Sequence, residues 1–179
     1  MALAAKYPKA RFQAADPSNY RAGRKTPVTL IVIHITSGRE RAQPVADMWT
    51  NEKHHGSSAH CVIDQDGSII QGIRFTDTAW HASNANAYSI GIEHCAREPG
   101  EFTRTTHKPD AGLPVSEAQY QSSAVMVAWI CKGLGLQPTR DSIKGHCEVD
   151  VVTTHTGCPN SIWDWDHYMA LVQAEYAKL

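Results

Sequence analysis

Three residues far apart in the chain have side chains that bind transition metals. His34 stands in a run of β-branched apolar residues, His146 follows Gly145 on a second, short predicted strand, and Cys158 lies directly before Pro159. Taken singly, each histidine is explained as well by a core residue bonded to a backbone carbonyl, and the cysteine by a small buried hydrophobe. Together they offer Zn²⁺ three protein ligands and leave a fourth position open for water. The set therefore predicts a catalytic zinc site.

Glu93 is a second residue whose type does not fit its surroundings. It lies in the otherwise apolar segment Ser-Ile-Gly-Ile-Glu-His at residues 89–94. A buried carboxylate without a partner costs several kcal/mol. The side chain is therefore either paired with an arginine or held as a general base beside a water that a metal ion activates. The sequence leaves both interpretations open.

The remaining histidines and cysteines offer a rival site. The chain has ten histidines and five cysteines, and an odd number of cysteines cannot all pair within one chain. His54 and His55 would be the start of a structural zinc site, but adjacent residues seldom bind one ion well, and a solvated turn is favoured. Cys95 and Cys147 each lie beside a proposed site residue, as core thiols or as a redox pair.

The elements that must position these side chains alternate between strands and helices. Apolar runs and helical spacing predict strands over 29–36, 88–95 and 143–149, a hairpin over 59–74, and helices over 44–51, 116–134 and 163–179. In the strand over 88–95, the period of two places Glu93 on the face opposite Ile92. This order predicts an α/β fold, a single domain with a central mixed β-sheet flanked by helices.

Length and charge narrow the class of protein further. The 179 residues suit one domain, which we place at 27–179 behind an extended N-terminal arm at 1–26. A formal net charge of −1 argues against nucleic acid as a partner, and no run reaches the ~20 apolar residues of a membrane span. The start lacks the pattern of a secretory signal peptide. We therefore expect synthesis in the cytoplasm and no membrane partner.

Six short segments, in this order, resemble the type 2 N-acetylmuramoyl-L-alanine amidases. That family includes phage lysozyme-type amidases, bacterial cell-wall recycling amidases and animal peptidoglycan recognition proteins. The resemblance covers roughly residues 27–170 and implies the fold of that family. The segments are Leu30-Ile-Val-Ile-His34, Ser58-Ala-His-Cys-Val-Ile63, Ala79-Trp-His-Ala82, Ser89-Ile-Gly-Ile-Glu93, Gly145-His-Cys-Glu-Val149 and Thr154-His-Thr-Gly-Cys-Pro159, followed by Trp163-Asp-Trp-Asp-His-Tyr-Met169.

The resemblance implies a role for each residue that matches a family motif. The metal ligands would be His34, His146 and Cys158, and Glu93 would be the catalytic glutamate. The substrate cleft would be formed with Trp80, His81 and His60, of which His60 has a structural role at least as readily as a catalytic one.

Two positions depart from the commonest pattern of the family. Many members place a lysine two residues before the third ligand, where it stabilises the developing oxyanion; here that position is Thr156. One extra residue separates His155 from Cys158 relative to similar members. Either Thr156 or His155 would therefore face the oxyanion, and His155 as third ligand is a lesser alternative.

The implied activity is zinc-dependent hydrolysis of the amide between the lactyl group of N-acetylmuramic acid and L-alanine. The partners would be peptidoglycan or muropeptides, and we expect a monomer with one Zn²⁺ per chain. The first interpretation is a phage endolysin or other bacteriolytic, antimicrobial amidase that reaches the cell wall after release or delivery. The alternatives are a cytosolic recycling amidase and a muropeptide-binding module without catalysis.

Overall fold

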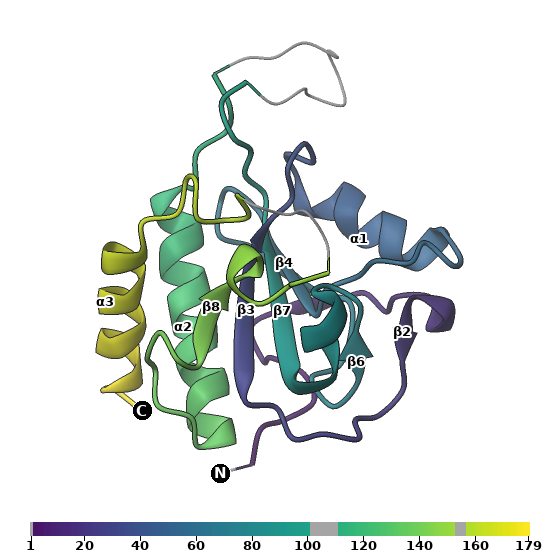
Figure 1. The fold of residues 1–179 in the computed structure, drawn as a ribbon, viewed down its shortest axis with the longest axis horizontal. Helices are drawn as coiled ribbons and strands as arrows, with labels where there is room; N and C mark the ends of the chain where they lie inside the picture. Colours follow the sequence, from purple (N-terminus) through teal and green to yellow (C-terminus); the bar gives the residue numbers. More distant parts are fainter. Residues whose placement is uncertain (1, 101–110, 153–156) are drawn as a thin grey trace.

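The computed structural model describes residues 2–100, 111–152 and 157–179, and within them a mixed six-stranded β-sheet runs through the centre (Figure 1). Helices α2 and α3 lie together against one face of this sheet, and α1 lies on the other side. The predicted α/β class with a mixed central sheet is confirmed. The strand order is β1 (Arg11–Phe12), β5 (Ile69–Gln71), β4 (Cys61–Ile63), β7 (Ser89–His94), β3 (Leu30–Ile35) and β8 (Ile143–Gly145).

The parallel pair β3 and β7 forms the middle of the sheet, with Leu30 opposite Ser89 and His34 opposite Glu93. All six side chains of β3 are buried, as expected of a β-branched run covered on both faces. Because side chains alternate along a strand, the isoleucines point towards α2 and α3, while His34 and Glu93 point to the opposite face. The isoleucines that pack on the helices are Ile31, Ile33, Ile35, Ile90 and Ile92.

Helices α2 (Glu117–Leu134) and α3 (Trp165–Tyr176) cover the isoleucine face. The predicted capping box is present, since the Ser116 side chain accepts the backbone N–H of Gln119 and the Gln119 side chain returns to the backbone N–H of Ser116. The prediction that α3 starts at Trp163 is wrong by two residues. Asp164 caps the helix by accepting the N–H of His167, which leaves Trp163 buried ahead of it. No helix in the described ranges is long and apolar enough to cross a membrane.

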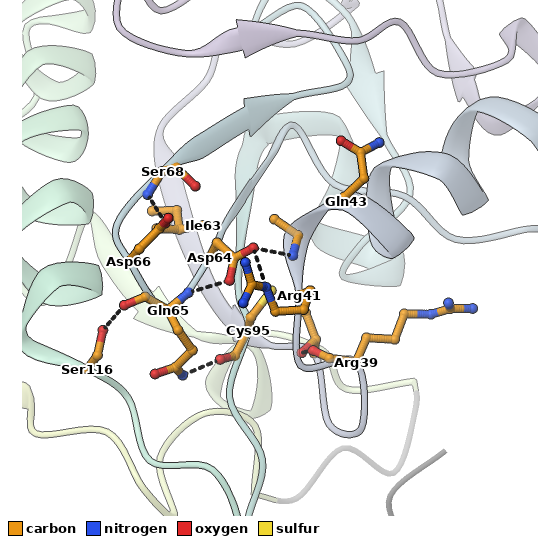
Figure 2. A network of polar contacts seen from close by, with 12 residues as sticks. Arg39, Arg41, Gln43, Ile63, Asp64, Gln65, Asp66, Ser68, Cys95 and Ser116 are labelled. Atoms are coloured by element: carbon orange, nitrogen blue, oxygen red, sulfur yellow. Dashed lines mark hydrogen bonds and ion pairs between the residues drawn. The ribbon is translucent and has the colours of Figure 1, made fainter. Parts of the chain in front are cut away.

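Helix α1 (Ala42–Asn51) begins two residues earlier than predicted because its N-terminus is capped from another element. Arg41 stands at the N-cap position and offers no side-chain acceptor there. Asp64, directly after β4, accepts the backbone N–H of Ala42 at 3.0 Å and Nε of Arg41 at 3.2 Å (Figure 2). A carboxylate near the positive end of the helix dipole stabilises this start.

The predicted hairpin is confirmed as the antiparallel pair β4 and β5, with Cys61 opposite Gln71. Its turn includes Gly67 at φ +82°, and a Cβ there would lie 2.8 Å from the backbone oxygen of Ala118, so the turn requires glycine. Next to the turn, the carbonyl of Gln65 accepts the hydroxyl of Ser116 at 2.7 Å, while the Gln65 amide donates to the carbonyl of Cys95 (Figure 2). These bonds tie the hairpin to the ends of α2 and β7.

The N-terminal segment, predicted as an extended arm, contributes strands to both sheets. Strand β1 pairs in parallel with β5, and β2 (Tyr20–Arg21) pairs with β6 (Thr78–Ala79) in a separate two-stranded sheet. Tyr7 is buried in the main core, and its backbone N–H donates to the Gln71 side chain at 2.8 Å. A short 3-10 helix, η1 (Pro17–Asn19), joins β1 and β2. The division between arm and domain at residue 26 stays a prediction.

The strand predicted over 143–149 is shorter than expected. Strand β8 ends at Gly145, and His146 begins a 3-10 helix, η3 (His146–Glu148). The Glu148 carboxylate turns back to accept the backbone N–H of Gly145, which stops the extended conformation. His146 therefore lies in a turn beyond the strand, and the prediction that it stands on the strand is wrong.

Candidate active site

Two of the predicted site residues come from the centre of the sheet. His34 and Glu93 are register partners near the carboxyl ends of β3 and β7, so their side chains lie on the same face. Ligands in sheets with parallel strands commonly bind beyond these carboxyl ends. The strand ladder thus places an imidazole beside a carboxylate at the edge where a substrate has access.

The two other predicted ligands reach the same point from segments beyond β8. One ring nitrogen of His34, one of His146 and Sγ of Cys158 all lie within 4.8 Å of one another. The backbone N–H of Ile35 points to Sγ of Cys158 at 3.4 Å, which ties the Cys158 segment to the end of β3. Among the described residues, this is the one group of three or more His, Cys, Asp or Glu side chains that are close enough for a single ion.

The residues fit zinc in chemistry and in spacing. Two imidazoles and a thiol match the ligand types of catalytic zinc sites, and tetrahedral bond lengths of about 2.0–2.3 Å put ligand atoms roughly 3.3–3.8 Å apart. The observed limit of 4.8 Å exceeds that spacing by about an ångström. A small contraction of side chains would complete the site. Burial raises the pKa of the Cys158 thiol, which a bound cation would oppose.

Glu93 has the features of an acid kept for a reaction. Its Oε2 is buried and has no hydrogen-bond partner among the described residues, and no arginine among them forms an ion pair with it. Desolvation raises its pKa to about 8. A carboxylate with so high a proton affinity takes up a proton readily near neutral pH. The alternative of an arginine salt bridge therefore lacks support.

A cavity of about 400 Å³ opens over these four side chains. Trp80 and His81 line it, and its far wall is formed by α1 and the segment after it. A second cavity of about 580 Å³, beside β5 and α2, contains neither histidine nor cysteine among its lining residues. The smaller cavity is therefore the candidate active site. Its other lining residues are Ile35, Thr36, Ser37, Arg39, Val45, Met48, Trp49, His55, Ser57 and Ser58.

His81 lies between β3 and β7 on the site face and has both ring nitrogens engaged. Its Nδ1 lies 3.0 Å from Nε2 of His34, and its Nε2 lies 3.1 Å from the hydroxyl of Ser89. Gly91 makes this position possible, because a Cβ at residue 91 would lie 2.4 Å from Cγ of the His81 ring. Burial lowers the pKa of His81 to about 3, so the ring is neutral. Its ring nitrogens face the protein while the residue lines the cavity, and the predicted contact of His81 with substrate stays a prediction.

His60 lies behind the site and outside the cavity lining. Its Nδ1 accepts the backbone N–H of Gly91 at 3.0 Å, and its Nε2 lies 2.8 Å from Nη2 of Arg24 and 3.2 Å from the carbonyl of Asp77. Burial, followed by the Arg24 charge, holds its pKa well below the usual range. These contacts favour the structural alternative, in which His60 supports β7 under His81.

Asp150 is a site residue that the sequence reasoning missed. Its Oδ2 lies 3.0 Å from Nε2 of His146, and both side chains are buried. The signal was the spacing of four residues between His146 and Asp150, which brings two side chains together in a helical turn. A strand predicted over 143–149 puts these two side chains apart, so the pair was not recognised.

The segment that carries His146 is held by a clamp of three side chains. Both carboxylate oxygens of Glu148 lie 2.6 Å from Nη2 of Arg140, and the Arg140 guanidinium lies 3.4 Å from the ring centre of Trp165. Nη1 of Arg140 also donates to the carbonyl of Ile143 at 2.6 Å. Since Glu148 closes η3 onto Gly145, the clamp links α3 to the position of His146.

The remaining histidines and cysteines singled out in the sequence lie outside the proposed ligand group. His155 and Thr156 lie outside the described residues. His55 lines the cavity wall and pairs with Glu52 at 3.6 Å, and no metal cluster within the described part of the chain includes it or His54. All five cysteines, including Cys95 and Cys147, are free thiols.

Comparisons with known proteins show which proteins this chain resembles. A family model described as N-acetylmuramoyl-L-alanine amidase matches residues 24–161. The 1,6-anhydro-N-acetylmuramyl-L-alanine amidase AmpD of Haemophilus influenzae is 32% identical over 65% of this chain, and the chain spans 59% of the length of that relative. N-acetylmuramoyl-L-alanine amidase A of Achromobacter lyticus is 28% identical over 92% of this chain and 93% of its own length.

Solved structures share the fold. The crystal structure of an AmpD selenomethionine derivative superposes with a TM-score of 0.72 over 96% of this chain and 99% of its own, at 24% identity. The structure of PlyL superposes with a TM-score of 0.66 over 93% of this chain and 98% of its own, at 17% identity. The sheet, the site at its edge and the match over residues 24–161 lead to one conclusion: this chain belongs to the N-acetylmuramoyl-L-alanine amidase family.

Proposed function

We propose that this protein hydrolyses the amide bond between the lactyl group of N-acetylmuramic acid and L-alanine in peptidoglycan or its fragments. The observation that carries the proposal is the buried Oε2 of Glu93, which has no hydrogen-bond partner among the described residues, beside His34, His146 and Cys158. A zinc site of three ligands alone would suit many roles. An acid of raised pKa, lining the same cavity as the ligand group, is what a hydrolase requires.

His34, His146 and Cys158 would hold one Zn²⁺ per chain. When bound, the ion would polarise the scissile carbonyl and lower the pKa of a water molecule to about 7. Glu93 takes a proton from the attacking water and passes it to the nitrogen of the departing L-alanine. Its desolvated position suits both transfers, because its proton affinity lies near the working pH.

The remaining roles follow from position in the cavity and from the family resemblance. Trp80, on the cavity wall, would pack against the substrate and exclude water. The oxyanion donor is proposed to be Thr156 or His155, on the sequence resemblance alone. Replacing each by alanine distinguishes them, since loss of an oxyanion donor costs about 10²–10³-fold in kcat and loss of a bystander costs little.

The test of the proposal is Glu93→Gln. We expect release of soluble peptides from purified sacculi to fall about 10²–10⁴-fold, the usual contribution of a general base, while zinc content stays near one per chain. A chelator should abolish turnover of the wild type. Normal cleavage by the variant would refute the role of Glu93, and binding of muropeptides without any turnover by the wild type would support the binding module.

The biological setting is a second part of the proposal. We infer a lytic amidase that acts on the polymer after release or delivery to the cell wall, in the manner of an endolysin, and that works as a monomer. The similarity to AmpD amidases favours recycling as the alternative, because their name specifies 1,6-anhydro-muropeptides. Turnover on intact sacculi, compared with turnover on soluble anhydro-muropeptides, distinguishes the two.

A further inference from the structure

Both histidines of the proposed metal centre have the Nε2 side of the ring held by the protein. Nε2 of His146 lies 3.0 Å from a carboxylate oxygen of Asp150, and Nε2 of His34 lies 3.0 Å from Nδ1 of His81. A neutral imidazole carries a proton on only one nitrogen, and the other is the one that can bind a metal. The partners at Nε2 therefore decide which nitrogen faces the ion.

On the His146 side the assignment follows from the chemistry of a carboxylate. An ionised carboxylate accepts hydrogen bonds and donates none, so the proton between the two side chains belongs to Nε2 of His146. Asp150 is fixed in place by two more donors: the hydroxyl of Ser83 at 3.1 Å and the backbone N–H of Val152 at 2.9 Å. With Nε2 protonated, Nδ1 of His146 is left as the metal-binding nitrogen.

On the His34 side the same result comes through a chain of neutral groups. The hydroxyl of Ser89 donates its one proton to the carbonyl of Ala85 at 2.7 Å, so towards His81 it can only accept. Nε2 of His81 therefore carries the proton, and Nδ1 of His81 is bare. A bare Nδ1 facing Nε2 of His34 makes His34 the donor, which again leaves Nδ1 for the metal.

We propose that two separate hydrogen-bond chains, Asp150 to His146 and Ser89–His81 to His34, hold both ligands as Nε2–H tautomers and present both Nδ1 atoms to Zn²⁺. The inference rests on the proposed function, since it concerns the same metal centre. Asp150, His81 and Ser89 are positioning residues: they act through the ligands and fix ring orientation before metal arrives. Without them, a ring in the other tautomer would turn an N–H towards the ion.

The first experiment uses the zinc-free wild type above pH 7, labelled with ¹⁵N. Long-range ¹H–¹⁵N correlation spectra distinguish protonated from bare ring nitrogens. We expect His34 and His146 each to show a protonated Nε2 and a bare Nδ1 before any metal is added. A protonated Nδ1 at either residue would overturn the proposal. This measurement needs no variant that has to fold.

The second experiment measures zinc affinity by chelator competition for two pairs of variants. Asp150→Asn should weaken binding about 10–100-fold, the usual effect of losing a partner that orients a metal ligand. Its matched control is Asp66→Asn, the same change at an exposed hairpin turn. Ser89→Ala should weaken binding less, because a neutral acceptor is lost. Its control is Ser123→Ala, a buried serine whose hydroxyl pairs with Tyr168 away from the site.

Zinc binding by the variants tests the positioning roles, and zinc binding by the wild type tests the proposed metal centre. If Asp150→Asn and Ser89→Ala bind zinc as tightly as their controls, the positioning roles are refuted and the amidase proposal stands. If the wild type itself binds no zinc, the proposed metal centre fails, and the spectra of the zinc-free protein still decide the tautomers. Weaker zinc binding in the two site variants, with unchanged controls and the expected spectra, supports the proposal.

Discussion

The two halves of the candidate active site are built in different ways. In the strand half, His34 and Glu93 are register partners in a parallel ladder, held in place by backbone hydrogen bonds on both sides. In the loop half, His146 and Cys158 lie outside any strand and depend on side chains such as Asp150 and Glu148. The strand half is therefore specified by the fold itself, and the loop half by a few polar contacts.

Single substitutions should therefore disturb the strand half less readily than the loop half. The β3–β7 pairing rests on many backbone hydrogen bonds. A single side-chain substitution therefore changes the positions of His34 and Glu93 little unless the new side chain clashes with the strand or with a residue packed on it. The loop half rests on a few side-chain contacts, so the loss of one of these side chains should displace His146.

Cys158→Ser removes the proposed metal ligand of the loop half. Loss of a polarising ion removes several kcal/mol of transition-state stabilisation, so turnover should fall by about 10³-fold or more. Among the described residues, the thiol accepts only the N–H of Ile35 at the end of β3, and the β3–β7 ladder is backbone pairing, so the variant should keep its secondary structure. Zinc content, measured by mass spectrometry, should fall well below one per chain. A variant that kept both zinc and turnover would remove Cys158 from the site.

Gly91→Ala adds a methyl group to β7 on the face of the site. The new Cβ would lie 2.4–2.7 Å from three atoms of the His81 ring, so either the ring or the strand must move. Overpacking of this kind costs about 1–3 kcal/mol. Urea denaturation should show that loss, together with weaker zinc binding through His34. Gly133→Ala in α2 is the comparison, since its new Cβ would lie 2.9 Å from Cα of Leu3, on the face of the sheet opposite the site. It should leave zinc binding unchanged, and zinc binding by Gly91→Ala as tight as that of the wild type would contradict the prediction.

His60 makes the strand half sensitive to acid. Its pKa in the folded protein is held below that of the unfolded chain, so the unfolded chain takes up the proton first as pH falls. The free energy of unfolding is therefore intact above about pH 6.5 and declines below it by up to about 1.4 kcal/mol per pH unit. His81 and His94, with pKa values of about 3 and about 4, act in the same direction.

The check is the pH dependence of urea unfolding between pH 7.5 and 4.5 for the wild type and His60→Gln, both without zinc. The variant should be less stable at neutral pH but should lose stability less steeply in acid. A slope unaffected by His60→Gln would show that this histidine is not held neutral.

Arg140→Ala opens the clamp of the loop half. The Arg140–Glu148 ion pair is about a third exposed, and the guanidinium covers Trp165, so the loss should be about 1 kcal/mol. Zinc affinity should fall several-fold with it, because η3 carries His146. Lys178→Ala removes a more exposed ion pair and should change neither quantity. Calorimetric Tm and zinc titration of both variants measure the difference.

The sequence predicted the strand half better than the loop half, and the reason is physical. The run around His34 is continuously apolar and β-branched, the segment around Glu93 alternates its faces with a period of two, and six short motifs placed the two segments in one family pattern. The start of α1 was misjudged because its cap, Asp64, comes from another element. Asp150 and the Arg140 clamp were missed because they depend on a turn at His146 and on contact with Trp165, neither of which is a local pattern.

The placement of the three proposed ligands has a further consequence for the life of the protein. An ion shared by His34, His146 and Cys158 would act as a removable cross-link between distant parts of the chain. A disulfide closing a loop of about 100 residues is worth about 4.7 kcal/mol in the chain-entropy view. The stabilisation from a metal cross-link instead depends on the concentration of free metal. It reaches about 2.7 kcal/mol when that concentration is 100 times the Kd. Resistance to unfolding would then follow the zinc concentration of the compartment in which the protein is found.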